Sequence, residues 1–420
     1  MRDPYERVIH FNQSRDERFL AIKYKLMASS AFRFFRGSCH LYYEDLASQQ
    51  TWKDQTITWI CGDLHVENFG SYRSRHQVVY FDLNDFDEAI LAHPTWDVSR
   101  FICSIFLAGK ELNIGDDDLK TIAAQLVDEY LNALRIGKAY AVEKETVDGI
   151  LKKYIATVSE RDPVAFIEAR CSLDKTSDRR YLVIDQKKYF KIESKSLYTA
   201  LIKTFSEDLD KLNTKNQSNF QVLDVAVRIA GTGSIGLNRY VFLVYNSENK
   251  TYTLFDMKQA QASSLSLSPF LKIEQPEWDD QAQRIQFIQT VMQYQTPAQL
   301  SRLDFQGQAY IVKALQPEQD KIDFKQCVDK PKKFTDACYN MARLIAYAQL
   351  RSTGRKGSST ADELINFAQQ AELWKTQLLK YTYNYAQQVE QDYQSFCKKS
   401  YAEYRTEQKT VMSKALHKPE

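Results

Sequence analysis

Two stretches near the N-terminal end indicate the fold of this chain: CGDLHVENFG, residues Cys61–Gly70, and YFDLNDFDEA, residues Tyr80–Ala89. Each is typical of a β-strand that ends in a polar loop. The first loop contains Asp63 and Asn68, and the second contains Asp85. Phosphoryl transfer from ATP uses a carboxylate to orient the acceptor hydroxyl, and an amide and a carboxylate to hold Mg²⁺. We therefore expect Asp63 to be catalytic, and Asn68 and Asp85 to bind the metal.

The alternative for these stretches is turn chemistry alone, because Asx side chains bond their own backbone in turns. The second stretch, however, continues to Pro94-Thr-Trp-Asp97 at the start of an apolar helix. From Gly62 to Asp97 the sequence resembles aminoglycoside phosphotransferases and choline kinases, in which Gly-Asp-x-His-x-x-Asn is followed by Asp-Phe-x-x-Ala and Pro-x-x-Asp. Asp97 is then expected to cap its helix and brace the catalytic loop, and His65 to brace that loop by hydrogen bonding. Arg36 is expected near the phosphates or the acceptor.

The composition restricts the class of protein. With 420 residues, of which 44% are hydrophobic, the chain can bury a large core, and its length indicates about two or three structural units. Its net charge of +2 gives no indication of nucleic-acid binding or of an anionic membrane surface. The seven scattered cysteines include no Cys-x-x-Cys pair, which argues against a disulfide scaffold or a zinc site. The sequence contains no apolar leader and no membrane-spanning stretch, so we expect a cytoplasmic protein, while secretion without a cleaved signal remains open.

The hydrophobic pattern predicts an α+β protein with a β-rich middle between helical ends. We expect the catalytic and metal loops in residues 1–180, a nucleotide-binding unit in residues 181–316, and helices that complete the first unit in residues 317–420. Helical patterns cover residues 12–28, residues 96–144, the region from residue 278, and most residues from 335 onward. Strand patterns cover residues 56–61, 77–83, 223–230, 240–245, 251–257 and 309–315, and residues 181–192 are typical of a hairpin.

A glycine string, Gly231-Thr-Gly-Ser-Ile-Gly236, matches the pattern Gly-x-Gly-x-x-Gly. A dinucleotide-binding turn requires a helix directly after the string, because the helix N-terminus receives the pyrophosphate. Residues 237–245 are instead rich in β-branched and aromatic types, which favour a strand, so NAD binding ranks last. In kinases a glycine-rich loop between two strands covers the nucleotide phosphates; a tight hairpin is the alternative. The nucleotide-binding residues expected here are Gly231, Thr232, Gly233, Ser234, Gly236 and Lys258.

Lys258 ends the third strand of this region. It stands where kinases place the lysine that binds the α- and β-phosphates. Taken alone, a surface lysine is the alternative, and only the upstream glycine loop favours the phosphate role. The expected cofactors are ATP and Mg²⁺.

The order of these parts differs from that of ordinary kinases, in which the glycine loop and the lysine precede the catalytic and metal loops. A circular permutation reconciles this order with a two-lobed, protein-kinase-like fold, and such permutations are tolerated where the termini lie together at the surface. On this hypothesis, Tyr310–Leu315 is the hinge between the lobes. Tyr339–Arg351 is the helix that precedes the catalytic loop.

Most of the chain, from Met27 to Ser400, is similar to the bacterial family called domain of unknown function 2252. The similarity rests on both motif stretches and on MASSAFRFFRG (residues 27–37), WDVSR (96–100), DVAVRIAGTGSIG (224–236), KQA (258–260) and YAQQVEQDY (385–393). Three positions depart from the family pattern: Gln259 replaces Glu, Gln349 replaces His, and residues 312–318 replace Arg-Gln-Leu-Arg-Asp-Met-Lys. The resemblance implies a phosphotransferase-like site without a settled substrate.

Together these features predict an ATP- and Mg²⁺-dependent phosphotransferase with an unidentified acceptor. Two alternatives use the same site. One is a nucleotide-binding regulatory module without turnover, which Gln259 favours. The other is an enzyme that transfers AMP from a nucleotide bound in reverse. The intact Asp63 favours catalysis, since a binding module does not need that carboxylate.

Overall fold

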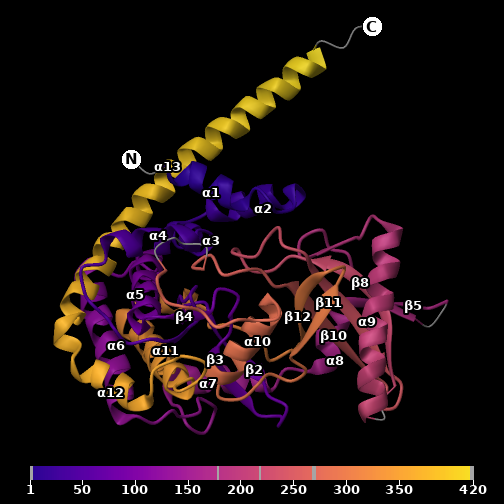
Figure 1. The fold of residues 1–420 in the computed structure, drawn as a ribbon. Coiled ribbons are helices and arrows are strands. Elements are labelled where there is room, and N and C mark those ends of the chain that lie inside the picture. Colours follow the sequence, from indigo (N-terminus) through magenta and orange to yellow (C-terminus); the bar gives the residue numbers. More distant parts are fainter. Residues whose placement is uncertain (1–2, 177–178, 217–218, 267–270, 417–420) are drawn as a thin grey trace.

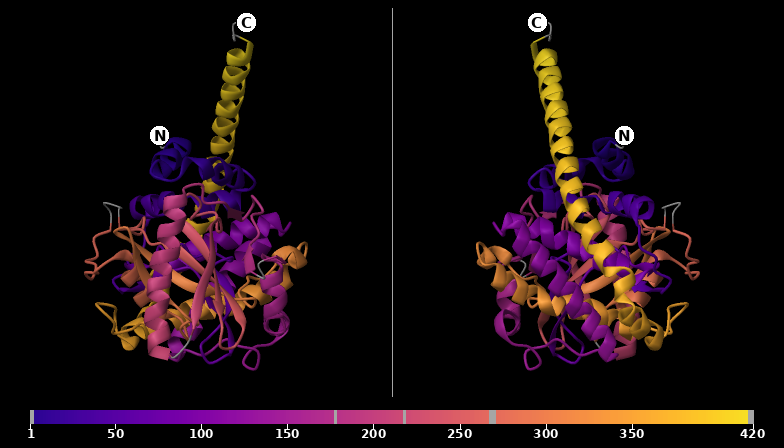
Figure 2. Two further views of the ribbon diagram at one scale, coloured as in Figure 1. Left: turned by 90° about the vertical axis from the view of Figure 1, so that its right-hand side faces the viewer. Right: turned by 90° about the vertical axis from the view of Figure 1, so that its left-hand side faces the viewer.

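Residues 3–176, 179–216, 219–266 and 271–416 are described by the computed structural model (Figure 1). In these residues, thirteen α-helices and a six-stranded antiparallel sheet form a mixed fold, which confirms the predicted α+β class. Most of the helices lie on one side of the molecule and the large sheet on the other, and the long C-terminal helix α13 extends past the body (Figures 1 and 2). No helix in the described ranges is both long and apolar enough to cross a membrane.

The large sheet has the strand order β11-β12-β10-β9-β8-β7, and each neighbouring pair is antiparallel. Successive side chains of a strand point to opposite faces. Along β10, Phe255 and Met257 pack in a cluster with Phe205 of α9, which covers one face (Figure 2). Asp256 and Lys258 point to the other face, where a cleft lies. The elements of this part are α8 (Pro163–Glu168), β5 (Cys171–Asp174), β6 (Arg179–Leu182), β7 (Tyr189–Phe190), α9 (Lys195–Asn216), β8 (Phe220–Arg228), β9 (Arg239–Asn246), β10 (Thr251–Gln259), α10 (Gln281–Met292), β11 (Ser301–Phe305) and β12 (Gln308–Leu315).

Both ends of the chain build one continuous apolar core beside the sheet. In this core α5 packs against α13, and α6 packs against α11. Two short antiparallel sheets, β1–β4 and β2–β3, carry the loops of the two sequence motifs. The elements of this part are α1 (Pro4–Asn12), α2 (Glu17–Met27), α3 (Ala31–Gly37), α4 (Cys39–Gln49), β1 (Thr58–Ile60), β2 (Phe69–Arg73), β3 (Val79–Leu83), β4 (Ile90–Ala92), α5 (Pro94–Glu111), α6 (Asp116–Ile136), α7 (Gly149–Ser159), α11 (Pro331–Arg351), α12 (Ala361–Gln369) and α13 (Lys375–Leu416).

Tertiary pairing corrects several local predictions. The helical pattern of residues 96–144 forms two helices, separated at residues 112–115. Residues 181–192 do not form a hairpin, because β6 pairs with β5 and β7 pairs with β8. Tyr310–Leu315 is part of β12, which pairs with β11 and β10 near one edge of the sheet, so it is a strand and not a hinge. The pattern analysis also missed α9, β2 and β11.

Candidate active site

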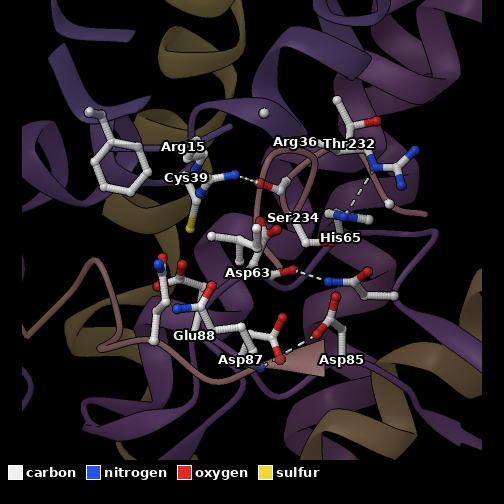
Figure 3. Close-up of a pocket in the computed structure, with 18 of the residues that line it drawn as sticks. Arg15, Arg36, Cys39, Asp63, His65, Asp85, Asp87, Glu88, Thr232 and Ser234 are labelled. Atoms are coloured by element: carbon white, nitrogen blue, oxygen red, sulfur yellow. Dashed lines mark hydrogen bonds between the residues drawn. The ribbon is translucent and has the colours of Figure 1, made fainter. Parts of the chain in front are cut away.

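One cleft contains eight of the nine residues that the sequence assigned to the site, and Figure 3 shows its outer part. Its outer part lies under the glycine loop and its inner part lies under the sheet, and the two parts share wall residues that include Asn68 and Asp85. Lys258 lines the inner part. Of the described loop residues, Gly236 stands apart from the cleft wall, and its carbonyl accepts a hydrogen bond from the N–H of Asp16. The assigned residues of the outer part are Asp63, Asn68, Asp85, Gly231, Thr232, Gly233 and Ser234.

Asp63 lies in the loop between β1 and β2, where a buried arginine holds it. Arg100 of α5 donates hydrogen bonds to Asp63 Oδ1 from Nε at 3.0 Å and from Nη2 at 2.5 Å. The guanidinium is fully buried and lies 4.0 Å from the ring centroid of Phe35. Burial raises the pKa of Asp63 to about 6, although the charge of Arg100 acts to lower it. A base with such a pKa is ionised at neutral pH and is close to the value that suits general-base catalysis.

Asp97 fixes the backbone of the same loop. Its Oδ2 accepts a hydrogen bond from the N–H of Cys61 at 2.7 Å, and its Oδ1 accepts one from the N–H of Gly62 at 2.9 Å. Asp97 therefore braces the loop, but the expected helix cap is wrong, because His93 is the N-cap and Asp97 lies in the first turn. Burial raises the pKa of Asp97 to about 7, against the effect of the two hydrogen bonds. Gly62 has a φ of +78°, and a Cβ there would lie 2.4 Å from the carbonyl oxygen of Glu88.

Asn68 and Asp85 offer oxygen atoms to the same part of the cleft. The amide nitrogen of Asn68 donates to the carbonyl of Asp63, which leaves the amide oxygen for another ligand. The side chain of Asp85 is 45% exposed, and its Oδ1 lies 3.9 Å from Lys258 Nζ. Burial acts to raise the pKa of Asp85, but the charges of Lys258, Lys313 and Arg239 and a backbone hydrogen bond from Asp87 together outweigh it, so the pKa lies below its usual value. Both groups thus present the hard oxygen atoms that Mg²⁺ prefers.

Lys258 connects the sheet to the metal loop. Its ammonium group forms an ion pair with Asp87 and lies near Asp85. Burial acts to lower the pKa of Lys258, but these two carboxylates outweigh it, so the pKa is raised. Arg284 of α10 holds the same loop in place, since it donates to the carbonyls of Asp87, at 2.8 Å, and Ala89. The positive charge of Lys258 is therefore fixed next to the expected metal ligands.

Two cations of the N-terminal segment, Lys23 in α2 and Arg15 in the turn before α2, hold the glycine loop. Lys23 Nζ donates to the carbonyl oxygens of Thr232, at 3.2 Å, and Gly233, at 2.7 Å. Arg15 donates to the carbonyls of Gly233 and Ile235. Lys23 is fully buried, and burial lowers its pKa well below its usual value. The tip of the loop therefore has a fixed position.

The glycine loop also lies close to the catalytic loop. A Cβ added to Gly233 would stand 3.8 Å from Asp63 Oδ2 and 3.6 Å from the carbonyl oxygen of Arg36. Asp63 Oδ2, which Arg100 does not hold, thus faces the space under the glycine loop (Figure 3). A group bound at Asp63 Oδ2 would therefore also contact the glycine loop.

The polar groups of His65 and Arg36 contact the loop that carries Asp63 and are not free in the open space of the cleft. The N–H of Glu67 donates to His65 Nδ1 at 3.1 Å, and the edge of the ring packs on Phe32, with centroids 5.7 Å apart. Burial lowers the pKa of His65 well below its usual value, so the ring is neutral. The guanidinium of Arg36 lines the cleft but is paired with Glu67. The expected bracing role of His65 therefore agrees with its contacts.

Sequence reasoning missed Arg100, Arg15 and Lys23 as parts of the site. The signal for Arg100 was its spacing from Asp97, because residues at i and i+3 share one face of a helix. The signal for Lys23 was its position between Phe19 and Met27 at spacings of four, which places it on the buried face of α2. Arg15 precedes α2 in a turn, and we find no comparable pattern for it.

Two of the three departures from the family pattern have packing roles. Gln259 accepts a hydrogen bond from the N–H of Asn238 at 3.2 Å and donates one to Gln308 at 2.9 Å. Gln349 is fully buried in α11 and accepts a hydrogen bond from the hydroxyl of Tyr130 at 2.6 Å. Both glutamines join neighbouring elements.

Comparison with known proteins gives one family. Residues 15–399 match the family described as "Uncharacterized protein conserved in bacteria (DUF2252)". No curated protein and no solved structure matches the chain. The contacts in the cleft are therefore the basis for a functional conclusion.

Proposed function

The chain belongs to the DUF2252 family, and because the description of that family names no activity, we propose from the site itself that the protein is an ATP- and Mg²⁺-dependent phosphotransferase with a circularly permuted, protein-kinase-like fold. The acceptor carries a hydroxyl group, since the site offers a carboxylate base. One observation carries the proposal. Asp63, Asn68 and Asp85 lie in the same cleft as the glycine loop and Lys258, although the two sets are far apart in the sequence.

The order of elements around the glycine loop supports the kinase comparison. The loop joins β8 to β9, and Lys258 lies on β10, the third strand counted from β8. In protein kinases the lysine likewise follows the glycine loop on the third strand. No helix follows the glycine string in this described segment, which is unlike a dinucleotide-binding turn.

Contact between the first and the last helix supports the permutation. The rings of Tyr5 in α1 and Phe396 in α13 lie 5.7 Å apart, and Asp3 forms an ion pair with Lys399. The first and last helices are therefore in contact at the surface (Figure 2). A fold tolerates a new starting point where the segments that carry its ends lie together at the surface.

The residues of the cleft fit Mg·ATP by their chemistry. Asn68 and Asp85 would hold the ion, and a set of two side chains suits Mg²⁺, which is usually completed by substrate phosphates and water. Among the described residues, no group of three or more His, Cys, Asp and Glu side chains is arranged to hold a metal by itself. When bound, the ion supplies positive charge that neutralises the phosphates. Lys258 and the backbone N–H groups of the loop at Gly231–Gly236 would bind those phosphates.

Asp63 performs the protein's part of the reaction. Arg100 fixes Oδ1, which orients the carboxylate and leaves Oδ2 toward the cleft. The acceptor hydroxyl donates its proton toward Oδ2 as its oxygen attacks the γ-phosphorus. The bond from that phosphorus to the oxygen that bridges it to the β-phosphate breaks, and ADP leaves. With a pKa of about 6, Asp63 is mostly ionised at neutral pH and accepts this proton. Asp97 and His65 keep the loop in position during transfer.

The experiment measures transfer from ATP labelled at the γ- or the α-phosphate, with extracts as the source of acceptors. Asp63→Asn should leave Mg·ATP affinity nearly unchanged and reduce transfer by about 10²–10⁴-fold. Asp85→Asn should weaken ATP binding and Mg²⁺ dependence together. Asp117→Asn is the matched control, because the Asp117 side chain is 99% exposed and lies far from the cleft wall.

Two outcomes would replace the proposal. Transfer of α-label with release of pyrophosphate would identify the AMP-transferring alternative. Binding of Mg·ATP without transfer or hydrolysis, unchanged by Asp63→Asn, would identify the regulatory alternative. In calorimetry, Lys258→Ala should weaken Mg·ATP binding by about 1.5–3 kcal/mol, and NAD should give no heat.

A further inference from the structure

The inner end of the cleft carries charged side chains that the proposed function does not use. Asp256 precedes Lys258 by two residues on the same face of β10, about 7 Å along the strand. Its carboxylate accepts hydrogen bonds from Arg228 Nη1 at 2.8 Å and from Arg239 Nε at 2.8 Å and Nη2 at 2.6 Å. Burial acts to raise the pKa of Asp256, but both arginines outweigh it and hold the pKa well below its usual value. Asp256 is therefore charged and neutralises one of the two arginines.

A third cation faces this group. Lys313 of β12 stands opposite Asp256 in the register of the sheet, and its side chain lines the cleft. The ion pairs of Asp256 are with Arg228 and Arg239. Within the described part of the chain, no carboxylate forms an ion pair with Lys313. Three cations around one carboxylate leave an excess of positive charge.

The apolar part of the same sheet face is already covered. Leu243 and Leu254 pack in a cluster with Ile167 of α8 and Leu182 of β6. Figure 1 shows α8 below β10 at this side of the sheet. A ligand pocket is usually lined mainly by apolar side chains. Here Ile167 and Leu182 cover the apolar part of this sheet face. The part of the face that stays open at the inner end of the cleft carries cationic side chains.

The inner part of the cleft as a whole also has more positive than negative side chains. Eight cationic side chains and five carboxylates line its inner part. Two of these carboxylates, Asp85 and Asp87, belong to the loop expected to hold the metal. Guanidinium and ammonium groups at such positions bind phosphate through charge-assisted hydrogen bonds. Three of these cations, around Asp256, lie about 7 Å along the strand from Lys258, away from the phosphates expected beside that lysine.

We infer that Arg228, Arg239 and Lys313 form a second anion subsite, which binds a phosphate group in addition to the phosphates beside Lys258. This phosphate belongs either to the ribose of the bound nucleotide or to a separate ligand that binds next to it. The two sources present the same chemistry to the three cations. The inference rests on the proposed function only in that the phosphates beside Lys258 are taken to be those of a nucleotide.

The test is calorimetry on the full chain with Mg²⁺, using three probes. These are ADP, ADP that carries a 2′- or 3′-phosphate, and inorganic phosphate titrated into protein saturated with ADP. The variant is Lys313→Met, which removes the charge and keeps the length of an unbranched side chain. Lys203→Met is the matched control, because Lys203 is 75% exposed on α9 at the opposite face of the sheet. If Lys313→Met does not fold, as judged by circular dichroism, Arg228→Gln takes its place.

For a ribose phosphate, we expect the phosphate-bearing ADP to bind about tenfold to a hundredfold more tightly than ADP. For a separate ligand, we expect inorganic phosphate to bind the ADP complex. In both cases Lys313→Met removes the gain and changes ADP affinity by less than about threefold, and Lys203→Met keeps the gain. If neither probe gives a gain, or if Lys313→Met weakens ADP and its phosphorylated form equally, the subsite does not exist. Phosphate uptake that depends on Lys313 without any ADP binding would refute the nucleotide proposal and leave the subsite standing.

Discussion

Replacement of Arg100 by methionine tests how the Asp63 carboxylate is held. In the native protein, the fully buried guanidinium makes two hydrogen bonds to Asp63 Oδ1 and a third, at 3.1 Å, to the carbonyl of Phe35. Breaking a buried ion pair by removing one partner typically costs about 3–5 kcal/mol, because the other charge stays buried without compensation. Methionine fills much of the space, so most of this cost is electrostatic. We expect Arg100→Met to lose about 3–5 kcal/mol of unfolding free energy at pH 8.

The pH dependence of this loss identifies its cause. The folded pKa of Asp63 is about 6, above its ordinary value of 3.8. A carboxyl group with a raised folded pKa favours the folded state at low pH, and this contribution is lost as pH rises through the folded pKa. Without Arg100 the folded pKa of Asp63 rises further. Above pH 6 the folded variant must either ionise the buried Asp63 without its partner or keep it protonated, and both reduce the free energy of unfolding. The loss should therefore shrink at pH 5, where Asp63 is protonated in the variant.

The assay is urea unfolding at pH 5 and pH 8, with the free energies taken from the midpoints and a common slope. In a double-mutant cycle with Asp63→Asn, much of the loss should be recovered, because the amide leaves no buried charge. The control is Arg302→Met, since Arg302 and Asp280 lie 3.6 Å apart with side chains 36% and 40% exposed, and such pairs contribute at most about 1 kcal/mol. An equal loss at both pH values, or no coupling in the cycle, would show that Arg100 acts through packing and not through the charge of Asp63.

Two further predictions concern the loops of the cleft. Lys23→Met removes the hydrogen bonds to the carbonyls of Thr232 and Gly233 while keeping the buried volume. The glycine loop should then exchange its amide hydrogens faster, and Mg·ATP should bind about threefold to tenfold more weakly. Native exchange rates together with native affinity would contradict the bracing role of Lys23. The transfer rate should rise with pH along an acid limb of apparent pKa about 6, because Asp63 must lose its proton to act as a base. If the residual activity of Asp63→Asn shows the same acid limb, the limb belongs to another group.

The sequence alone determined the parts of this protein that are local. A strand followed by a polar loop places Asp63 and Asn68 five residues apart, so the motif itself fixes their proximity. Strand propensity after Gly236 distinguished a loop between two strands from a dinucleotide-binding turn, and β9 begins at Arg239 as that pattern predicts. The α+β class followed from the same kind of local pattern.

Only the tertiary structure decided which distant groups complete those parts. Asp63 is held by Arg100, and the glycine loop is held by Lys23, which lies 209 residues before Thr232. The predicted hairpin at residues 181–192 failed for the same reason, since each of its halves pairs with a strand outside it. Local propensity is a property of neighbouring residues, whereas the partner of a buried charge or of a strand edge depends on how the whole chain packs. The motifs therefore named the groups that we expect to react, and the packing of both chain ends around the sheet determined what orients them.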